Sequence, residues 1–228
     1  MIETLIPAAE VTELCQRNWD HSNPIPEEHI EEILGVATRM PTKQSIPIYE
    51  IAISTNKKLN KQMVRMANDP RTPSSKGRNA QVSAPLLLMW LSDPNAPQFN
   101  QDKCYEATGI QFKSNPTDVD LAVGISAGGA SLAAANLGYK TGFCGCFQLP
   151  HMINLAAKGN PEVKGKELHL MLGIGHPHPF IKERNILESP FWTEAKPQHN
   201  IKGRVIRPLG PKHDTIKIHR MYDEDSAH

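Results

Sequence analysis

The sequence has no excess of charge of one sign. Its 228 residues include 25 Lys and Arg against 24 Asp and Glu, which gives a formal net charge of +1. Proteins that bind nucleic acid or an anionic membrane through their overall field carry a strong positive balance. The sequence therefore argues against both partners, and any anion site has to be built locally.

Cysteines and long apolar runs are also scarce. The four cysteines, at positions 15, 104, 144 and 146, are too few and too scattered for a disulfide-stapled fold. The N-terminus lacks the basic region, apolar stretch and cleavage site of a secretory signal. The most membrane-like segment, 121–137, is mostly Ala, Gly and Ser, which favours a buried helix over a membrane span. We therefore expect a soluble, cytoplasmic protein.

Several catalytic and metal signatures are missing. Gly173–Gly175 lacks the third glycine and the following helix of a dinucleotide-binding fingerprint. No cysteine has an evident catalytic partner. Cys144 and Cys146, taken with His176 and His178, match the usual spacing of zinc ligands poorly. We expect no metal site.

What the sequence does contain is an alternation of helix and strand patterns without repeats. A proline opens 26–40 and apolar residues fall on one face of it, which predicts a helix. The unbroken apolar run 84–91 predicts a central strand. The remaining patterns predict helices at 56–67, 118–138 and about 150–158, and strands at 48–54, 141–148, 167–174 and, late in the chain, 215–220.

These patterns predict one α+β domain over residues 1–228. No linker separates two cores. The segment from about 185 to 228 is rich in Pro, His and charge and cannot form a core of its own. We expect this extension to pack on the body of the domain or on a second subunit.

Five short motifs follow one another in a fixed order, among them a polar loop at Ser75–Arg78 and a strand-and-turn segment at Gly173–Arg184. Cys15-Gln-Arg-Asn-Trp19 precedes the first predicted helix, and a loop bounded by Pro41 and Pro47 follows that helix. Further on, Asp120 opens a small-residue helix that runs into the glycine-cysteine strand beginning at Thr141. Taken singly, each motif has an ordinary structural interpretation, such as a solvated arginine, a helix-to-strand connection or a buried helix.

In this order the motifs resemble those of the FMN-dependent nitroreductase family, a resemblance that spans residues 15–184. It implies a nitroreductase-like three-layer fold, with a mixed, mostly antiparallel sheet flanked by helices, in an intertwined homodimer. It also implies FMN as cofactor and NAD(P)H as transient reductant, with hydride passing through flavin N5 to a nitroaromatic, quinone or similar acceptor. No side chain is expected to act as catalyst.

The resemblance assigns cofactor contacts to nine positions. Arg17 falls on a basic position for the flavin phosphate, with Cys15 in place of a serine, and Gln44 replaces an asparagine at the flavin ring. Backbone near Gly145 faces flavin N5. The full set is Cys15, Arg17, Gln44, Ser75, Arg78, Cys144, Gly145, Lys182 and Arg184.

Other positions depart from the family pattern. Glu13 stands where the first arginine is expected, and Ile46 and Ile48 stand where the family has a glutamine and a tryptophan. Two alternatives therefore remain open: a specialised flavoenzyme on the same fold, such as a dehydrogenase, dehalogenase or flavin-fragmenting enzyme, or a non-enzymatic FMN-binding dimer.

Overall fold

The computed structural model describes residues 5–13, 15–66, 80–111, 113–145 and 149–180. The described residues fall within one compact unit, Met1–Glu183. The expected strand at 215–220 and the expected packing of the C-terminal extension lie outside the described residues, and both stay predictions.

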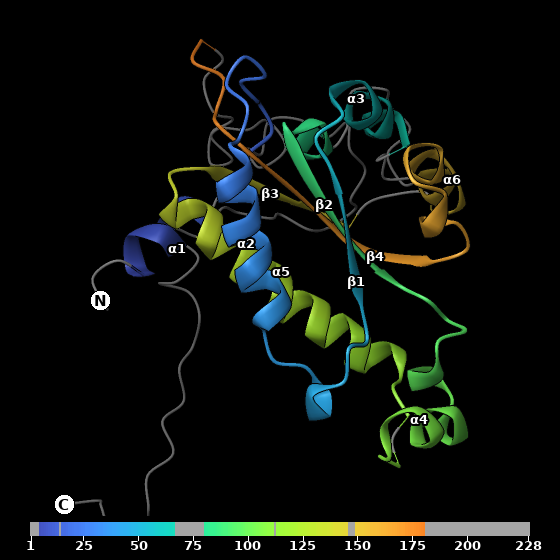
Figure 1. Cartoon of the computed structure of the whole chain (residues 1–228). Helices are drawn as coiled ribbons and strands as arrows, with labels where there is room; N and C mark the ends of the chain where they lie inside the picture. Colours follow the sequence, from blue (N-terminus) through green and yellow to red (C-terminus); the bar gives the residue numbers. More distant parts are fainter. Residues whose placement is uncertain (1–4, 14, 67–79, 112, 146–148, 181–228) are drawn as a thin grey trace, which may run out of the picture. The chain divides into compact units, whose positions relative to one another are not determined.

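A four-stranded sheet forms the middle layer (Figure 1). Its strands are β1 (Glu50–Ser54), β2 (Leu86–Ser92), β3 (Lys140–Cys144) and β4 (Glu167–Gly175), in the order β1-β2-β4-β3. Every neighbouring pair is antiparallel. Every residue of β2 is buried, because both faces of the sheet are covered, which explains its unbroken apolar run.

Helices α2 (Glu27–Arg39) and α5 (Pro116–Asn136) cover one face of the sheet (Figure 1). Side chains alternate between the faces of a strand, so Leu86, Leu88 and Trp90 pack here. Two consecutive buried hydrogen bonds join β2, α5 and α2 in this layer. The indole nitrogen of Trp90 donates to Ser126 Oγ at 2.8 Å, and Ser126 Oγ donates to the Ala37 carbonyl at 2.8 Å.

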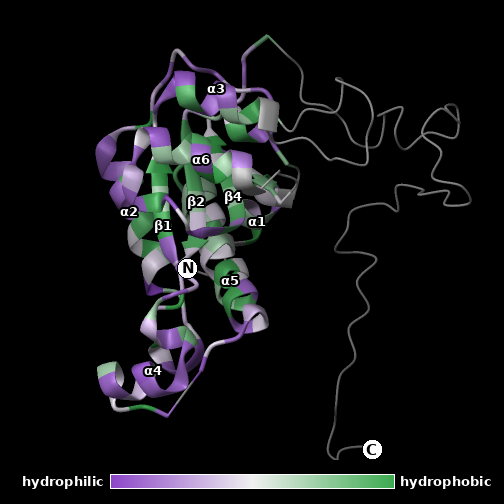
Figure 2. Ribbon diagram, turned by 90° about the vertical axis from the view of Figure 1, so that its right-hand side faces the viewer, coloured by the Kyte–Doolittle hydropathy of each residue, from purple (hydrophilic) through white to green (hydrophobic). Residues whose placement is uncertain are grey.

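Helices α3 (Lys57–Met66) and α6 (Leu149–Gly159) cover the opposite face. Leu87, Met89 and Leu91 from β2 pack there against Met63 and Met152. Figure 2 shows the hydrophobic colour concentrated on the strands between the helices, and also present on α5. The predicted α+β class and three-layer arrangement are confirmed.

The long helix α5 owes its start to local chemistry. The Asn115 side chain accepts from the Asp118 amide at 2.9 Å, the Asp118 carboxylate accepts from the Asn115 amide at 3.1 Å, and Pro116 occupies the first turn. This reciprocal cap satisfies amides that the helix leaves free. Gly138, at φ 87°, turns the chain after the helix. The observed bounds lie close to the predicted 118–138.

Some boundaries differ from expectation. Strand β1 begins at Glu50 rather than at Ile48, which is buried ahead of the strand. Strand β3 ends at Cys144, the last residue paired with β4, rather than continuing toward 148. Helices α1 (Leu5–Glu13) and α4 (Gln101–Thr108) were not predicted. No helix of the described ranges combines the length and apolar character needed to cross a membrane.

Candidate functional site

The segment 15–20 is fixed against the edge of the sheet by backbone contacts. The Gln16 amide donates to the Thr141 carbonyl at 2.8 Å, and the Asp20 amide donates to the His176 carbonyl at 2.9 Å. The Trp19 side chain is buried, and its indole nitrogen donates to the Ala80 carbonyl at 3.1 Å. These contacts hold Cys15 and Arg17 beside β3.

Cys15 and Arg17 form a half-buried pair. The Cys15 thiol donates to the Phe143 carbonyl at 3.6 Å. Burial raises the pKa of this thiol, and the adjacent Arg17 guanidinium acts against that rise. Within the described residues no carboxylate lies at ion-pair distance from Arg17. Arg17 is therefore a partly desolvated cation beside a protonated thiol, which suits an anionic group.

Cys144 and Gly145, at the end of β3, differ in exposure. The Cys144 side chain is buried in the cluster with Met152 and Met171, so only its backbone could contact a ligand. Gly145 is exposed, and a Cβ built on it would meet nothing within 4 Å. The main chain at Gly145 is thus open on the side where a Cβ would lie, and its contact with a flavin stays a prediction.

Gln44 lies in the loop between α2 and β1. Gln44 and Ser45 both have positive φ, 54° and 59°. For non-glycine residues this conformation costs about 1–2 kcal/mol each, and such strain concentrates at functional sites. Both residues are exposed. The adjacent Lys43 is held by Asp118, to which its ammonium donates at 3.1 Å.

One chain does not bring Gln44 and Arg17 together. The Gln44 loop is tied to Asp118 at the start of α5, through Lys43. The segment beside Arg17 is tied to Thr141, whose hydroxyl lies 2.7 Å from that of Ser131 further along α5. Thirteen residues separate Asp118 from Ser131, about 20 Å of helix. The predicted contacts thus fall into two separate groups within one chain.

The remaining assigned positions are Ser75, Arg78, Lys182 and Arg184. They lie outside the described residues, and their cofactor contacts stay predictions.

A second polar constellation was missed by sequence reasoning. Ser92 Oγ lies 2.8 Å from His169 Nε2, and His169 Nδ1 lies 3.0 Å from the Asp120 carboxylate. This is the connectivity of a serine nucleophile, a base and an orienting acid. Ser92, however, is 3% exposed on the central strand β2, so a substrate carbonyl cannot reach it. The three residues come from different elements, and no spacing in the sequence predicts that they lie together.

Titratable ligands for a metal are not clustered. Within the ranges that the structure describes, no group of three or more His, Cys, Asp or Glu side chains is placed to hold an ion.

Solved structures share the fold of this chain. A nitroreductase family protein from Clostridium novyi aligns with a TM-score of 0.58 at 12% identity, over 77% of this chain and 86% of its own. Nitroreductase A from Vibrio parahaemolyticus aligns with a TM-score of 0.55 at 18% identity, over 79% and 72%. An oxidoreductase containing FMN aligns with a TM-score of 0.54 at 16% identity, over 75% and 76%.

No protein-family model and no curated protein sequence matches the chain. At identities this low, the likeness to solved structures shows the fold alone. The protein therefore has a nitroreductase-like fold, an antiparallel sheet between two helical layers, in a sequence that has diverged far from those structures.

Proposed function

We propose that the protein is an FMN-dependent oxidoreductase that passes hydride from NAD(P)H to a small acceptor such as a nitroaromatic compound or a quinone. One observation carries this proposal: on a nitroreductase-like frame, Cys15 and Gln16 contact β3 just before Arg17, and the open backbone at Gly145 directly follows that strand. These are positions that the sequence resemblance assigns to the cofactor.

The donor set suits a flavin mononucleotide. Arg17 offers a guanidinium without a described carboxylate partner, fitting the phosphate dianion. The open main chain at Gly145 admits the edge of a ring system, and Gln44 offers an amide to its polar rim. When bound, FMN would supply the hydride chemistry at N5. The chain's own part is to bind, orient and shield that group.

A second copy of the chain would unite the two groups of contacts. Helix α5 exposes Leu121 (62%) and Ile125 (46%), and Gly124 and Gly128 lie on the same side of the helix. Exposed apolar side chains interleaved with glycines suit close packing against another helix. These observations support a homodimer in which Arg17 of one protomer and Gln44 of its partner face one cofactor.

Purified protein tests the proposal directly. We expect a yellow protein whose absorbance near 450 nm is bleached by NADH or NADPH under anaerobic conditions and restored by a nitroaromatic or a quinone. A colourless protein that takes up no added FMN would contradict every flavin function for this chain.

Matched variants test the assigned contacts. Arg17→Ala should weaken FMN binding by about 1–3 kcal/mol, the range for a charge-assisted hydrogen bond. Gly145→Ala should weaken FMN binding without loss of stability, because its Cβ meets no protein atom. Arg39→Ala, on the exposed face of α2, is the control. Unchanged FMN affinity in both test variants would show that Arg17 and Gly145 do not belong to the FMN site.

A non-enzymatic FMN-binding dimer is the second candidate. Ile46 (4% exposed) and Ile48 (0%) occupy positions where the family resemblance places a glutamine and a tryptophan, and here both pack in the core. The loop thus offers fewer groups to a flavin and its substrate. Protein that binds FMN but is not bleached by either reductant would favour this candidate.

A further inference from the structure

Strand β3 lies at the edge of the sheet, with β4 on one side only. Backbone groups on the outer edge of such a strand need partners from elsewhere in the chain. The Gln16 amide supplies one of them, because it donates to the Thr141 carbonyl at 2.8 Å. The next carbonyl on this edge, that of Phe143, accepts from side chains of two other segments.

Gln81 is the stronger of the two donors to the Phe143 carbonyl. Its side-chain nitrogen lies 3.1 Å from that oxygen, whereas the Cys15 sulfur lies 3.6 Å from it, and a thiol is a weak donor. Gln81 is 3% exposed. A buried amide is tolerated where it is hydrogen-bonded, so the bond to Phe143 gives a specific reason for a polar side chain at this position.

The segment that carries Gln81 is held in place by its own contacts. It is the short helix η3 (Ala80–Ser83), and its Ala80 carbonyl accepts from the Trp19 indole at 3.1 Å. The backbone of η3 also lies directly on the sheet, because a Cβ on Gly173 would come within 2.0 Å of the Gln81 carbonyl oxygen. Gln81 therefore reaches β3 from a fixed segment.

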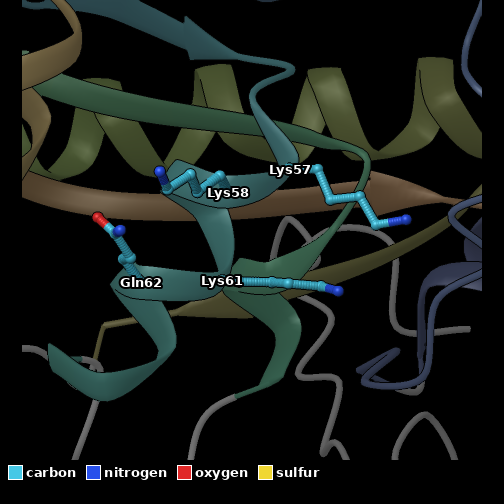
Figure 3. Close-up of a pocket in the computed structure, with 4 residues that line it drawn as sticks. All are labelled: Lys57, Lys58, Lys61 and Gln62. Atoms are coloured by element: carbon cyan, nitrogen blue, oxygen red, sulfur yellow. The ribbon is translucent and has the colours of Figure 1, made fainter.

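Helix α3 contributes to holding this segment through a buried residue. Asn60 is fully buried, and its side-chain amide donates at 2.9 Å to the carbonyl of Ala84, directly after η3. The exposed side chains of α3 have a different environment, an open cavity of about 480 Å³ (Figure 3), and those that line it are Lys57, Lys58, Lys61 and Gln62. The link from α3 to the segment of Gln81 thus includes Asn60.

The Phe143 carbonyl lies close in the chain to the proposed flavin contact. Strand β3 ends at Cys144, the last residue paired with β4, and Gly145 lies just beyond the pairing. The planar peptide unit that contains the Phe143 carbonyl is separated from the Gly145 amide by the two backbone torsions of Cys144 alone. The Cys144 side chain is buried. Fixing the Phe143 carbonyl therefore restricts how the Gly145 main chain can be oriented.

We propose that Gln81 is a positioning residue: by holding the Phe143 carbonyl it fixes the end of β3, and it thereby orients the Gly145 main chain toward the flavin ring. This role rests on the proposed flavin function for its ligand and on the contacts of Gln81 for its geometry. In this role Gln81 acts through the strand rather than by contact with the flavin. It affects the ring, whereas Arg17 affects the phosphate.

The first test uses flavin-free protein and NMR. Gln81→Met keeps the length of the side chain and removes the donor, so the carbon shift of the Phe143 carbonyl and the nitrogen shift of the Cys144 amide should both move. Tyr49→Phe is the matched control, because it removes a side-chain bond of the same length, 3.1 Å, to the Ala37 carbonyl. It should leave both shifts in place. Unchanged shifts in Gln81→Met overturn the positioning role.

Binding of FMN and of riboflavin gives the second readout. Gln81→Met should weaken both ligands by about three- to tenfold, the effect of a typical hydrogen bond, because both ligands contain the ring. Arg17→Ala should weaken FMN and spare riboflavin, which has no phosphate. Tyr49→Phe should bind both within twofold of wild type. If Gln81→Met does not fold, Gln81→Glu, which keeps the size and lacks the N–H donor, replaces it in both tests.

The two tests separate the positioning role from the flavin function. Moved shifts in a protein that takes up neither flavin support the positioning of β3 and contradict the proposed function. A protein that binds both flavins, with affinities unchanged in Gln81→Met, keeps the function and overturns the role of Gln81. Equal losses in Gln81→Met and Tyr49→Phe, or a loss toward FMN alone, also overturn that role.

Discussion

At the residue scale, the informative feature is the thiol of Cys15 beside the Arg17 guanidinium. Two opposing effects act on the thiol: burial disfavours the thiolate, and the cation favours it. Burial is the larger, so the pKa lies above the ordinary value and the group stays protonated at neutral pH. Cys15 therefore serves as a neutral donor to the Phe143 carbonyl rather than as a nucleophile.

Alkylation of Cys15 tests this balance. The rate of modification by iodoacetamide, followed at this residue by peptide mass spectrometry, should rise with pH to a midpoint above the ordinary thiol value of about 8.5. Arg17→Met should move the midpoint still higher, because it removes the effect that lowers the pKa. Arg39→Met, on the exposed face of α2, should leave it in place, because the cation that acts on this thiol is Arg17. A midpoint below 8 in the wild type would show that Arg17 outweighs burial.

At the element scale, a pair of glycines lets other segments lie directly on the sheet. Gly142 of β3 is paired with Gly173 of β4. A Cβ on Gly142 would lie 2.3 Å from the Gln16 carbonyl oxygen, and a Cβ on Gly173 would lie 2.0 Å from that of Gln81. Both obstacles are backbone atoms. The glycines thus allow the contacts that hold the segment carrying Arg17.

Substitution at Gly173 should be costly. Gly173→Ala forces a backbone shift and should lower the free energy of unfolding by at least about 1–3 kcal/mol, the usual range for overpacking. Urea denaturation measures the loss. Gly145→Ala is the control. It adds the same methyl group directly after β3, where the Cβ meets no atom within 4 Å. Equal midpoints for the two variants would mean that η3 (Ala80–Ser83) does not lie against the sheet as described.

Elements with a strong local signal could be predicted from the sequence. Helix α2 has an apolar face, β2 an unbroken apolar run, and α5 a proline and small residues ahead of Gly138. Helix α4 lacks such a face: only Cys104 is buried, and the helix depends on the Asn100 cap and on Gly109 at φ 71°. Helix α1 buries only Ala8 among its residues of described exposure. Periodicity cannot reveal elements that contribute so little to a core.

The candidate site was less predictable for a different reason. Motif order along the chain made Arg17, Gln44 and Gly145 candidates, but the contact between Cys15 and Phe143 joins residues 128 apart. Such proximity depends on the tertiary fold, and one sequence carries no direct signal of it.

At the scale of the whole molecule, the exposed side of α5 is where assembly can be tested. Gly124 and Gly128 have free space around them within one chain. In an isolated chain Gly→Ala at either position should stabilise the helix by up to about 1 kcal/mol. In the proposed homodimer the added methyl groups would push two helices apart.

Gly124→Ala/Gly128→Ala therefore distinguishes the two states. We expect the double variant to dissociate at protein concentrations where the wild type is dimeric, as measured by analytical ultracentrifugation. Glu106→Ala, exposed on α4 rather than on α5, should leave the assembly intact. A double variant that stays dimeric and is more stable than the wild type would show that the interface does not lie on this side of α5.

About 20 Å of α5 separates the Gln44 loop from the Arg17 segment. In the proposed homodimer this separation affects both ligand binding on dilution and complementation between variant subunits. A ligand that contacts Gln44 of one subunit and Arg17 of the other is held by both only while the subunits are associated. Diluting the protein until the dimer dissociates should therefore release the ligand. The same separation permits complementation. Arg17→Ala and Gln44→Ala subunits, each defective alone, would form a mixed pair in which one site inherits both substitutions and the other is wholly wild type.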